Sequence, residues 1–174
     1  MYHRKNFKAN SQIKLPDGYL NGQSMGDLAT LKIGGTTIND AGCGPIAVYN
    51  AMQYLGKPLP LAQVVKELET YAAPIDAHFG VSGILLMIFF LRHRVRFRIA
   101  RRIKKFDQSQ AGVLLYWTKR PIFSSGHFVF YRKEEDGRIG IFNRYCNRDQ
   151  IYYVDSVREI AAQKLIQMGY ILKK

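Results

Sequence analysis

Three residues far apart in the chain have side chains suited to nucleophilic catalysis: Cys43, His127 and Asn143. Cys43 lies in the segment AGCGPIAVYN, where Pro45 favours the first turn of a helix. The start of a helix carries partial positive charge and free N–H groups, which lower the pKa of a thiol and can bind a developing oxyanion. A free cysteine is also often a buried apolar residue, so this position alone leaves both interpretations open.

His127 begins the alternating apolar segment HFVFYR, which predicts a strand. The turn residues at 134–137 predict a hairpin whose register places residues 143–146 opposite His127. In that window, the side-chain amide of Asn143 would fix the tautomer and orientation of the imidazole. Cys146 falls in the same window, and a slip of one residue would reverse the face of the strand. A structural histidine and a turn asparagine therefore remain the alternatives.

The elements that must position these residues follow from the hydrophobic periodicity. The segment from Pro45 to Leu55 is apolar nearly all round and predicts a central, buried helix that ends at Gly56. Amphipathic spacing predicts a second helix over 60–72, and the apolar segment 81–91 predicts a third. Alternating segments predict strands over 94–99, 112–117, 126–132, 138–143 and 150–154. The spacing of Ser156 and Glu159 predicts a last helix that ends near Gly169.

Helices followed by an antiparallel series of strands indicate an α+β fold, in which an N-terminal helical lobe packs on a C-terminal sheet. The chain has 174 residues, which suits one domain. Residues 1–35 are expected to form an arm of turns, and residues 36–174 a single domain of two lobes. The two cysteines exclude a disulfide framework and paired zinc ligands, so neither a metal nor a cofactor is expected.

The segments GCGPIAVYNAM, GHFVFY and IGIFN together resemble the papain-like cysteine peptidase superfamily, over about residues 36–145. More narrowly, they resemble the bacteriocin-processing (double-glycine leader) peptidase group. The resemblance implies a papain-like fold and a cysteine peptidase, with Cys43 as nucleophile, His127 as general base and Asn143 as orienting residue. Its substrate would be a peptide or protein whose peptide or amide bond is cleaved.

The sequence departs from this family just before the cysteine. Family members carry a glutamine there that completes the oxyanion hole, whereas this chain reads GGTTINDAGC. Asn39 is the nearest amide and is the candidate for that role. Two alternatives stay open: an acyltransferase that uses the same triad, and a catalytically silent module that binds a peptide or a polyanion.

The net charge of +13 is concentrated in one stretch. Residues 92–105 hold eight Lys or Arg and no acid, and Arg94, Arg96 and Arg98 alternate with apolar residues. They are expected to form an exposed anion-binding face, or simply a solvated one. The expected partner is acidic; no recognised nucleic-acid motif accompanies the stretch, so a nucleic acid is not expected.

The segments of the chain give two expectations about its location. The longest apolar run is far shorter than the roughly 20 residues of a membrane span, so no span is expected. The N-terminal segment lacks the apolar region of a signal peptide. The expected compartment is therefore the cytoplasm, or the exterior if a removed segment precedes residue 1.

Overall fold

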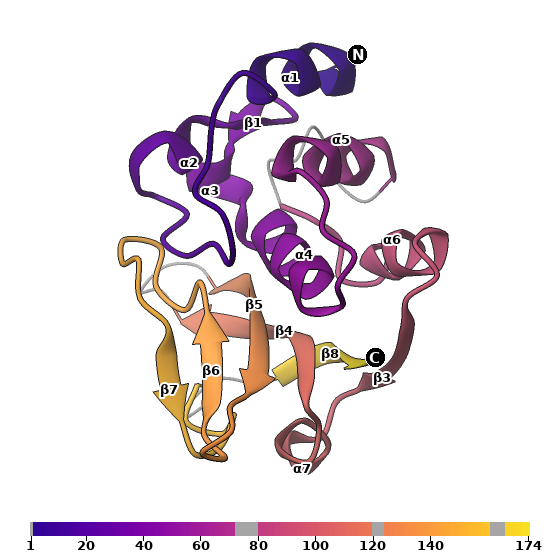
Figure 1. The fold of residues 1–174 in the computed structure, drawn as a ribbon, viewed down its shortest axis with the longest axis vertical. Coiled ribbons are helices and arrows are strands. Elements are labelled where there is room, and N and C mark those ends of the chain that lie inside the picture. Colours follow the sequence, from indigo (N-terminus) through magenta and orange to yellow (C-terminus); the bar gives the residue numbers. More distant parts are fainter. Residues whose placement is uncertain (1, 72–79, 120–123, 161–165) are drawn as a thin grey trace.

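The computed structural model describes residues 2–71, 80–119, 124–160 and 166–174, and these form the α+β fold that the sequence predicts (Figure 1). The helices are α1 (Tyr2–Asn10), α2 (Gly26–Thr30), α3 (Ile38–Ala41), α4 (Cys43–Tyr54), α5 (Leu61–Tyr71), α6 (Leu86–Arg92) and α7 (Ile103–Asp107). The strands are β1 (Lys32–Ile33), β2 (Thr36–Thr37), β3 (Arg96–Ala100), β4 (Ala111–Lys119), β5 (Ser124–Lys133), β6 (Ile139–Phe142), β7 (Tyr152–Val154) and β8 (Ile166–Lys173).

Most strands join one antiparallel, six-stranded sheet in the order β3-β8-β4-β5-β6-β7, and β1 pairs with β2 separately. In the hairpin of β5 and β6, Phe130 pairs with Phe142, which confirms the register predicted from the turn at 134–137. On its other side β5 pairs with β4, where Tyr116 lies opposite His127. Strand β6 ends at Phe142, so it does not continue alongside the part of β5 that carries His127.

Helix α4 is the central, buried helix that its apolar sequence predicts, and it packs beside β5 (Figure 1). Its side chains Ile46, Val48 and Ala51 have no exposed surface. The one polar side chain buried within it, Asn50, accepts a hydrogen bond from the Leu20 N–H and donates one to the Leu20 carbonyl, both at 2.8 Å. A buried amide must satisfy its hydrogen-bonding groups, and Asn50 does so with the main chain of Leu20. The two bonds thereby attach the N-terminal segment to the central helix.

The first 35 residues differ from the arm of turns that the sequence predicts. They contain α1, α2 and β1, and their side chains Leu20, Leu28 and Ile33 are buried in the same core as α4. Two side-chain amides hold helix α1 in place. Asn10 Nδ2 donates to the main-chain oxygen of Lys32, and Asn6 Nδ2 donates to Glu69 Oε1 of α5. The sequence does not predict this packing, because the segment is mostly polar and its few apolar side chains follow no helical or strand periodicity.

The sequence predicts a last helix from Ser156 to Gly169. This prediction is wrong for residues 166–169, the part of that range that the structure describes beyond 165. Residues 166–173 form β8, and the part of the predicted helix over 161–165 lies outside the described residues. The local signal at its start is nevertheless present, since Glu159 Oε1 accepts the Ser156 N–H at 3.0 Å. Gly169 lies between β3 and β4, where a Cβ atom would approach Phe106 to 2.7 Å, so close packing rather than a helix end requires glycine.

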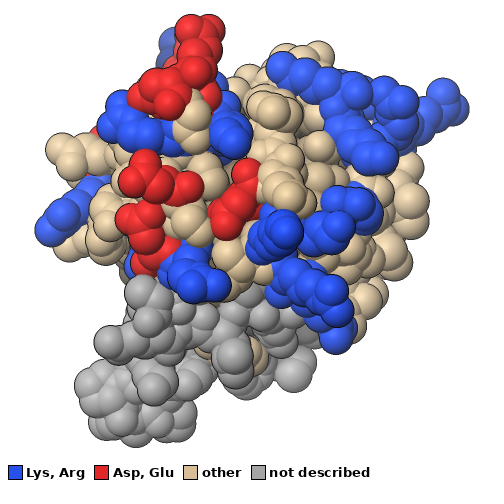
Figure 2. All heavy atoms as spheres, turned by 90° about the horizontal axis from the view of Figure 1, so that it is seen from below, with Lys and Arg blue, Asp and Glu red and all other residues tan. Residues whose placement is uncertain are grey.

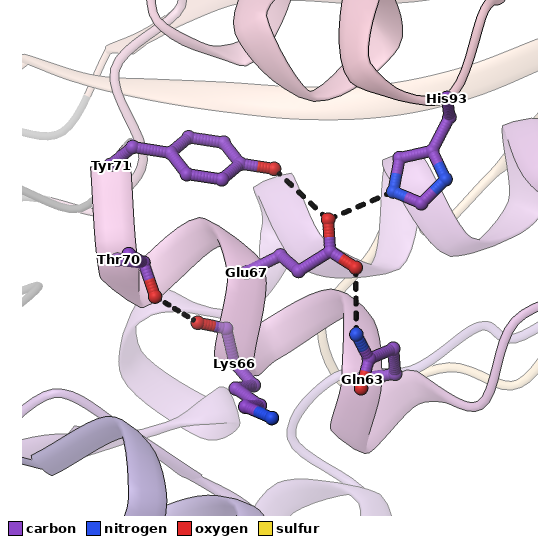
Figure 3. A network of polar contacts seen from close by, with 6 residues as sticks. All are labelled: Gln63, Lys66, Glu67, Thr70, Tyr71 and His93. Atoms are coloured by element: carbon purple, nitrogen blue, oxygen red, sulfur yellow. Dashed lines mark hydrogen bonds and ion pairs between the residues drawn. The ribbon is translucent and has the colours of Figure 1, made fainter.

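Helices α5 and α6 are joined by a polar network around Glu67 (Figure 3). His93, just after α6, lies 2.8 Å from Glu67 Oε2, and Gln63 donates to Glu67 Oε1 at 2.7 Å. Tyr71 donates to Oε2 at 3.3 Å. Burial alone would raise the pKa of Glu67, but the hydrogen bonds from Gln63 and His93 hold it below its usual value.

Candidate functional site

Cys43 is the first residue of α4, as the sequence predicts, and its half-buried side chain packs against the core. The main chain of Phe128 forms a hydrogen bond with its thiol. The sulfur therefore lies beside the strand residue that directly follows His127. Close packing of α4 on β5 makes this possible, because a Cβ atom on Gly44 would lie 2.9 Å from Val81 and 3.6 Å from Phe128.

The environment of the Cys43 thiol works in two opposite directions. Burial is the largest effect and raises the pKa of the thiol above its usual value. The hydrogen bonds from the main chain of Phe128, Gly44 and Cys43 itself lower the pKa, as the helix start was expected to do. Burial outweighs them, so the resting thiol is neutral at physiological pH rather than a preformed thiolate.

His127 is buried at the side of the sheet where β6 has ended, and only 8% of it is exposed. Its Nε2 lies 2.8 Å from the main-chain oxygen of Asn143. A carbonyl oxygen can only accept, so Nε2 carries a proton, and Nδ1 is the ring nitrogen that can gain or lose one. In the neutral imidazole, this contact favours the tautomer protonated on Nε2, which a general base acting through Nδ1 needs.

Asn143 contacts His127 as the hairpin predicted, but through its carbonyl and not through its side-chain amide. Its backbone is left-handed, with φ of 57°. Asn21 Oδ1 accepts the Asn143 N–H at 2.7 Å, and the side-chain amide exchanges two hydrogen bonds with Gln23, at 3.2 Å and 3.0 Å. Three hydrogen bonds from the N-terminal segment thus hold the turn that aims the carbonyl at His127.

Gln23 is one residue at this site that the sequence analysis did not identify. It is buried, and its Nε2 also donates to the main-chain oxygen of Asn39 at 3.0 Å. Gln23 therefore links Asn143, beside the imidazole, to the segment that precedes α4. It lies 20 positions before Cys43, far outside the spacing of a family glutamine, and nothing in the sequence pattern marks it.

The other side of His127 is formed by Tyr116, its partner on β4. The two rings lie 5.7 Å apart in an edge-to-face arrangement. Arg144 Nη1 donates to the Tyr116 hydroxyl at 2.6 Å, yet burial still raises the pKa of Tyr116 to about 12. Tyr116 stays a neutral hydroxyl in the functional pH range and packs as a wall against the imidazole. Hairpin counting between β4 and β5 would have found it.

Asn39, the candidate for the oxyanion hole, is exposed in α3, close before Cys43 in the chain. Its Nδ2 donates to Asp40 Oδ1 at 2.7 Å. The amide is thus engaged with a neighbouring carboxylate in this structure. Its part in binding an oxyanion stays a prediction.

Cys146 follows Asn143 by three residues and is half-buried. Its carbonyl accepts the Ser24 N–H at 2.8 Å, so the same N-terminal segment holds this turn. A charge on Cys146 raises the pKa of Cys43, which places the two thiols in one electrostatic environment. The site thus contains both cysteines of the chain.

The basic stretch lies away from this site, at the edge of the sheet. Arg96 and Arg98 are exposed on β3 as predicted, whereas Arg94 precedes the strand in a turn with φ of 51°. The alternation also differs at Ile99, which was expected in the core but is 47% exposed. The edge position of β3 leaves this side chain uncovered.

Two further properties concern the described part of the chain. It holds no group of three or more His, Cys, Asp or Glu side chains that could bind a metal ion. None of the helices found there is both long and apolar enough to cross a membrane.

Comparison with models of protein families finds no match to this chain, and a search of curated proteins finds no similar sequence.

Proposed function

We propose that the protein is a thiol hydrolase of the cysteine-peptidase type with a papain-like arrangement of its site. One observation carries this proposal. The Cys43 thiol, at the start of a buried helix, is hydrogen-bonded to the main chain of Phe128, and the preceding His127 is held in the general-base tautomer by the Asn143 carbonyl. In the proposed site, Cys43 supplies the nucleophile, His127 the base and Asn143 the group that orients the base.

Acylation is the first half of the proposed reaction. His127 Nδ1 accepts the proton of Cys43 while the sulfur forms a bond to the carbonyl carbon of the substrate, and the electron pair of the C=O bond moves to oxygen. The main-chain N–H groups of Cys43 and Gly44, at the start of α4, lie beside the thiol and are therefore suited to bind this oxyanion, whereas Pro45 has no N–H to contribute. When the C–N bond breaks, His127 gives its proton to the leaving amine and a thioester remains.

Hydrolysis of the thioester completes the cycle. His127 removes a proton from water as its oxygen attacks the thioester carbon, and the sulfur leaves with the C–S bond electrons. The proton returns to Cys43, and a carboxylic acid is released. Because burial keeps the resting thiol neutral, proton transfer to His127 accompanies the attack.

The proposal is tested with a proteome-derived peptide library and the full chain. New peptide termini should appear with the wild type and disappear with Cys43→Ala and with His127→Ala. Cys146→Ala is the matched control, because it removes the second thiol near the site and leaves the proposed nucleophile. Cleavage that persists in Cys43→Ala, or that depends on Cys146, would contradict the assignment.

The raised pKa of the buried Cys43 thiol favours one second candidate, a silent module that binds a peptide at this site. The same library separates the two, since a silent module retains peptides without cutting them. An acyltransferase is separated by adding a primary amine: its products carry the amine on the acyl group, whereas a hydrolase releases the free acid.

A further inference from the structure

Ten exposed cations gather at the edge of the sheet that β3 forms. We name this set the basic edge: Arg92, Arg94, Arg96, Arg98, Arg101, Arg102, Lys104, Lys105, Lys173 and Lys174. Viewed from below, the right side of the molecule, where β3 and α7 lie, shows Lys and Arg without Asp or Glu, whereas the left side shows Asp and Glu mixed with further Lys and Arg (Figure 2). Lys173 belongs to this set because it pairs with Arg96 across β8 and β3.

No Asp or Glu side chain among the described residues forms an ion pair with the basic edge, and within the edge Arg96 Nη2 donates to the main-chain oxygen of Lys174 at 2.8 Å. The ion pairs in the described part of the chain join Glu67 to His93, Glu134 to Arg132 and Asp136 to Arg138. A protein of average composition spreads its charges in mixed sign, so an unpaired group of this size creates a strong local positive potential. An acidic ligand is the chemical class that this potential attracts.

The strand beneath these charges is also open along one side. In the described part of the chain, β3 is the first strand of the sheet and pairs with β8 alone. The outer side of such a strand presents unpaired N–H and C=O groups that can accept another strand. A ligand at this place is therefore offered main-chain hydrogen bonds in addition to charge.

The two faces of β3 differ in character. Arg96 and Arg98 project from one face and are exposed. Phe97 and Ile99 lie on the other face, where Phe97 packs against the core and Ile99 stays 47% exposed. Alternate residues of a strand are about 6.6–6.8 Å apart, and this spacing is the same in an added strand. A strand with acidic residues on one face and apolar residues on the other therefore complements both.

We propose that the basic edge binds an extended acidic peptide segment of a partner protein, which adds to the sheet as a strand beside β3. Acidic side chains of the segment lie opposite Arg96 and Arg98, and an apolar side chain of the other face covers Ile99. The partner sequence is thus one in which acidic and apolar residues alternate. This interaction does not depend on the proposed hydrolase activity.

Two other occupants fit these observations less well. A second copy of the chain would bring its own β3 arginines against Arg96 and Arg98, and like charges directly opposite each other destabilise a pair of strands. A nucleic acid would neutralise the cations, but it would use neither the open main chain of β3 nor the apolar surface of Ile99.

The test measures binding of a short synthetic peptide of alternating glutamate and valine to the full chain carrying Cys43→Ser, which prevents cleavage. Three probes of matched charge accompany it: the same residues in two blocks, the alternating peptide with N-methylated amides, and single-stranded oligothymidylate. We expect the alternating peptide to bind most tightly and to weaken as salt increases.

The protein variants make the assignment specific to β3. Arg96→Glu/Arg98→Glu should weaken the alternating peptide at least about tenfold, and Ile99→Ser should weaken it less. Arg4→Glu/Lys8→Glu changes the net charge equally on exposed positions of α1 and should leave binding unchanged. Equal binding of the N-methylated peptide, tighter binding of the oligonucleotide, an equal loss in the α1 variant, or no binding of the peptide would each overturn the proposal.

Discussion

His127 Nε2 lies 2.8 Å from the main-chain oxygen of Asn143, and the side chain of Asn143 turns away to Gln23. The carbonyl of a left-handed residue thus orients the imidazole, where the sequence predicted a side-chain amide. The Asn143 side chain acts one step further out, because its two hydrogen bonds with Gln23 hold the turn that presents the carbonyl. Asn143 is accordingly a positioning residue.

Substitutions of Asn143 should separate the effect of its side chain from that of its backbone. Asn143→Gly and Asn143→Ala both leave buried groups of Gln23 unpaired, at a cost of about 1–3 kcal/mol. The Cβ atom of alanine also disfavours the left-handed φ, so Asn143→Ala should lower the free energy of unfolding by about 1 kcal/mol more than Asn143→Gly. Urea unfolding measures this difference.

The imidazole provides the control for the same two variants. Both keep the carbonyl, so the nitrogen chemical shifts of His127 should still report a protonated Nε2 in each folded variant. A change of tautomer in Asn143→Gly, or equal stability of the two variants, would contradict this account of Asn143.

The parts of this site that the sequence predicts are those set by local patterns. The apolar run after Cys43 and the turn at 134–137 place the nucleophile at a helix start and His127 opposite the turn after Phe142. The bond between Gln23 and Asn143 spans 120 positions, and no periodicity reports a contact between two irregular segments. Around Gly169 a local pattern is present but misleads. The capping signal at Ser156 predicts a helix, whereas the chain forms strand β8, which is held between β3 and β4 by pairing with both.

The pH dependence of alkylation tests the environment of the Cys43 thiol. Because burial raises its pKa above the usual thiol value of 9.0, iodoacetamide should modify Cys43 slowly at pH 7, and the rate should rise with pH to beyond 9. The measurement uses Cys146→Ser, so that Cys43 is the remaining thiol, and the unfolded chain in denaturant gives the reference rate. Rapid modification of Cys43 at pH 6 would instead show the thiolate that the helix start alone predicts.

Gly44 should be required for the close packing of α4 on its neighbours. In a helix, alanine is favoured over glycine by about 1 kcal/mol. At this position, however, a Cβ atom would lie 2.9 Å from Val81 Cβ, and overpacking in a core costs about 1–3 kcal/mol. We expect the clash to prevail, so that Gly44→Ala lowers the denaturant midpoint. A variant more stable than the wild type would show that Val81 moves freely.

Glu67 should make the stability of the protein depend on pH in the acid range. Its pKa is lower in the folded protein than the usual carboxyl value of 4.5, so its contribution to stability is complete well above pH 4.5 and is lost as the pH falls through the folded value. Glu67→Gln removes this dependence. Between pH 7 and pH 3, the wild type should therefore lose more stability than Glu67→Gln in thermal unfolding. Glu135→Gln, in an exposed turn, is the control and should behave as the wild type. Parallel curves for the wild type and Glu67→Gln would show that the network in Figure 3 does not favour the carboxylate.

Formation of an acyl-enzyme tests whether Cys43 is the nucleophile and His127 its base. The full chain carrying Cys146→Ser is mixed with an activated ester such as p-nitrophenyl acetate, and intact-mass spectrometry with peptide mapping follows the acyl group. We predict an adduct on Cys43 that forms at least about 100-fold more slowly when His127→Gln is added, the lower range of general-base catalysis. An adduct that forms at the same rate without His127, or that maps away from Cys43, would contradict the proposed nucleophile and base.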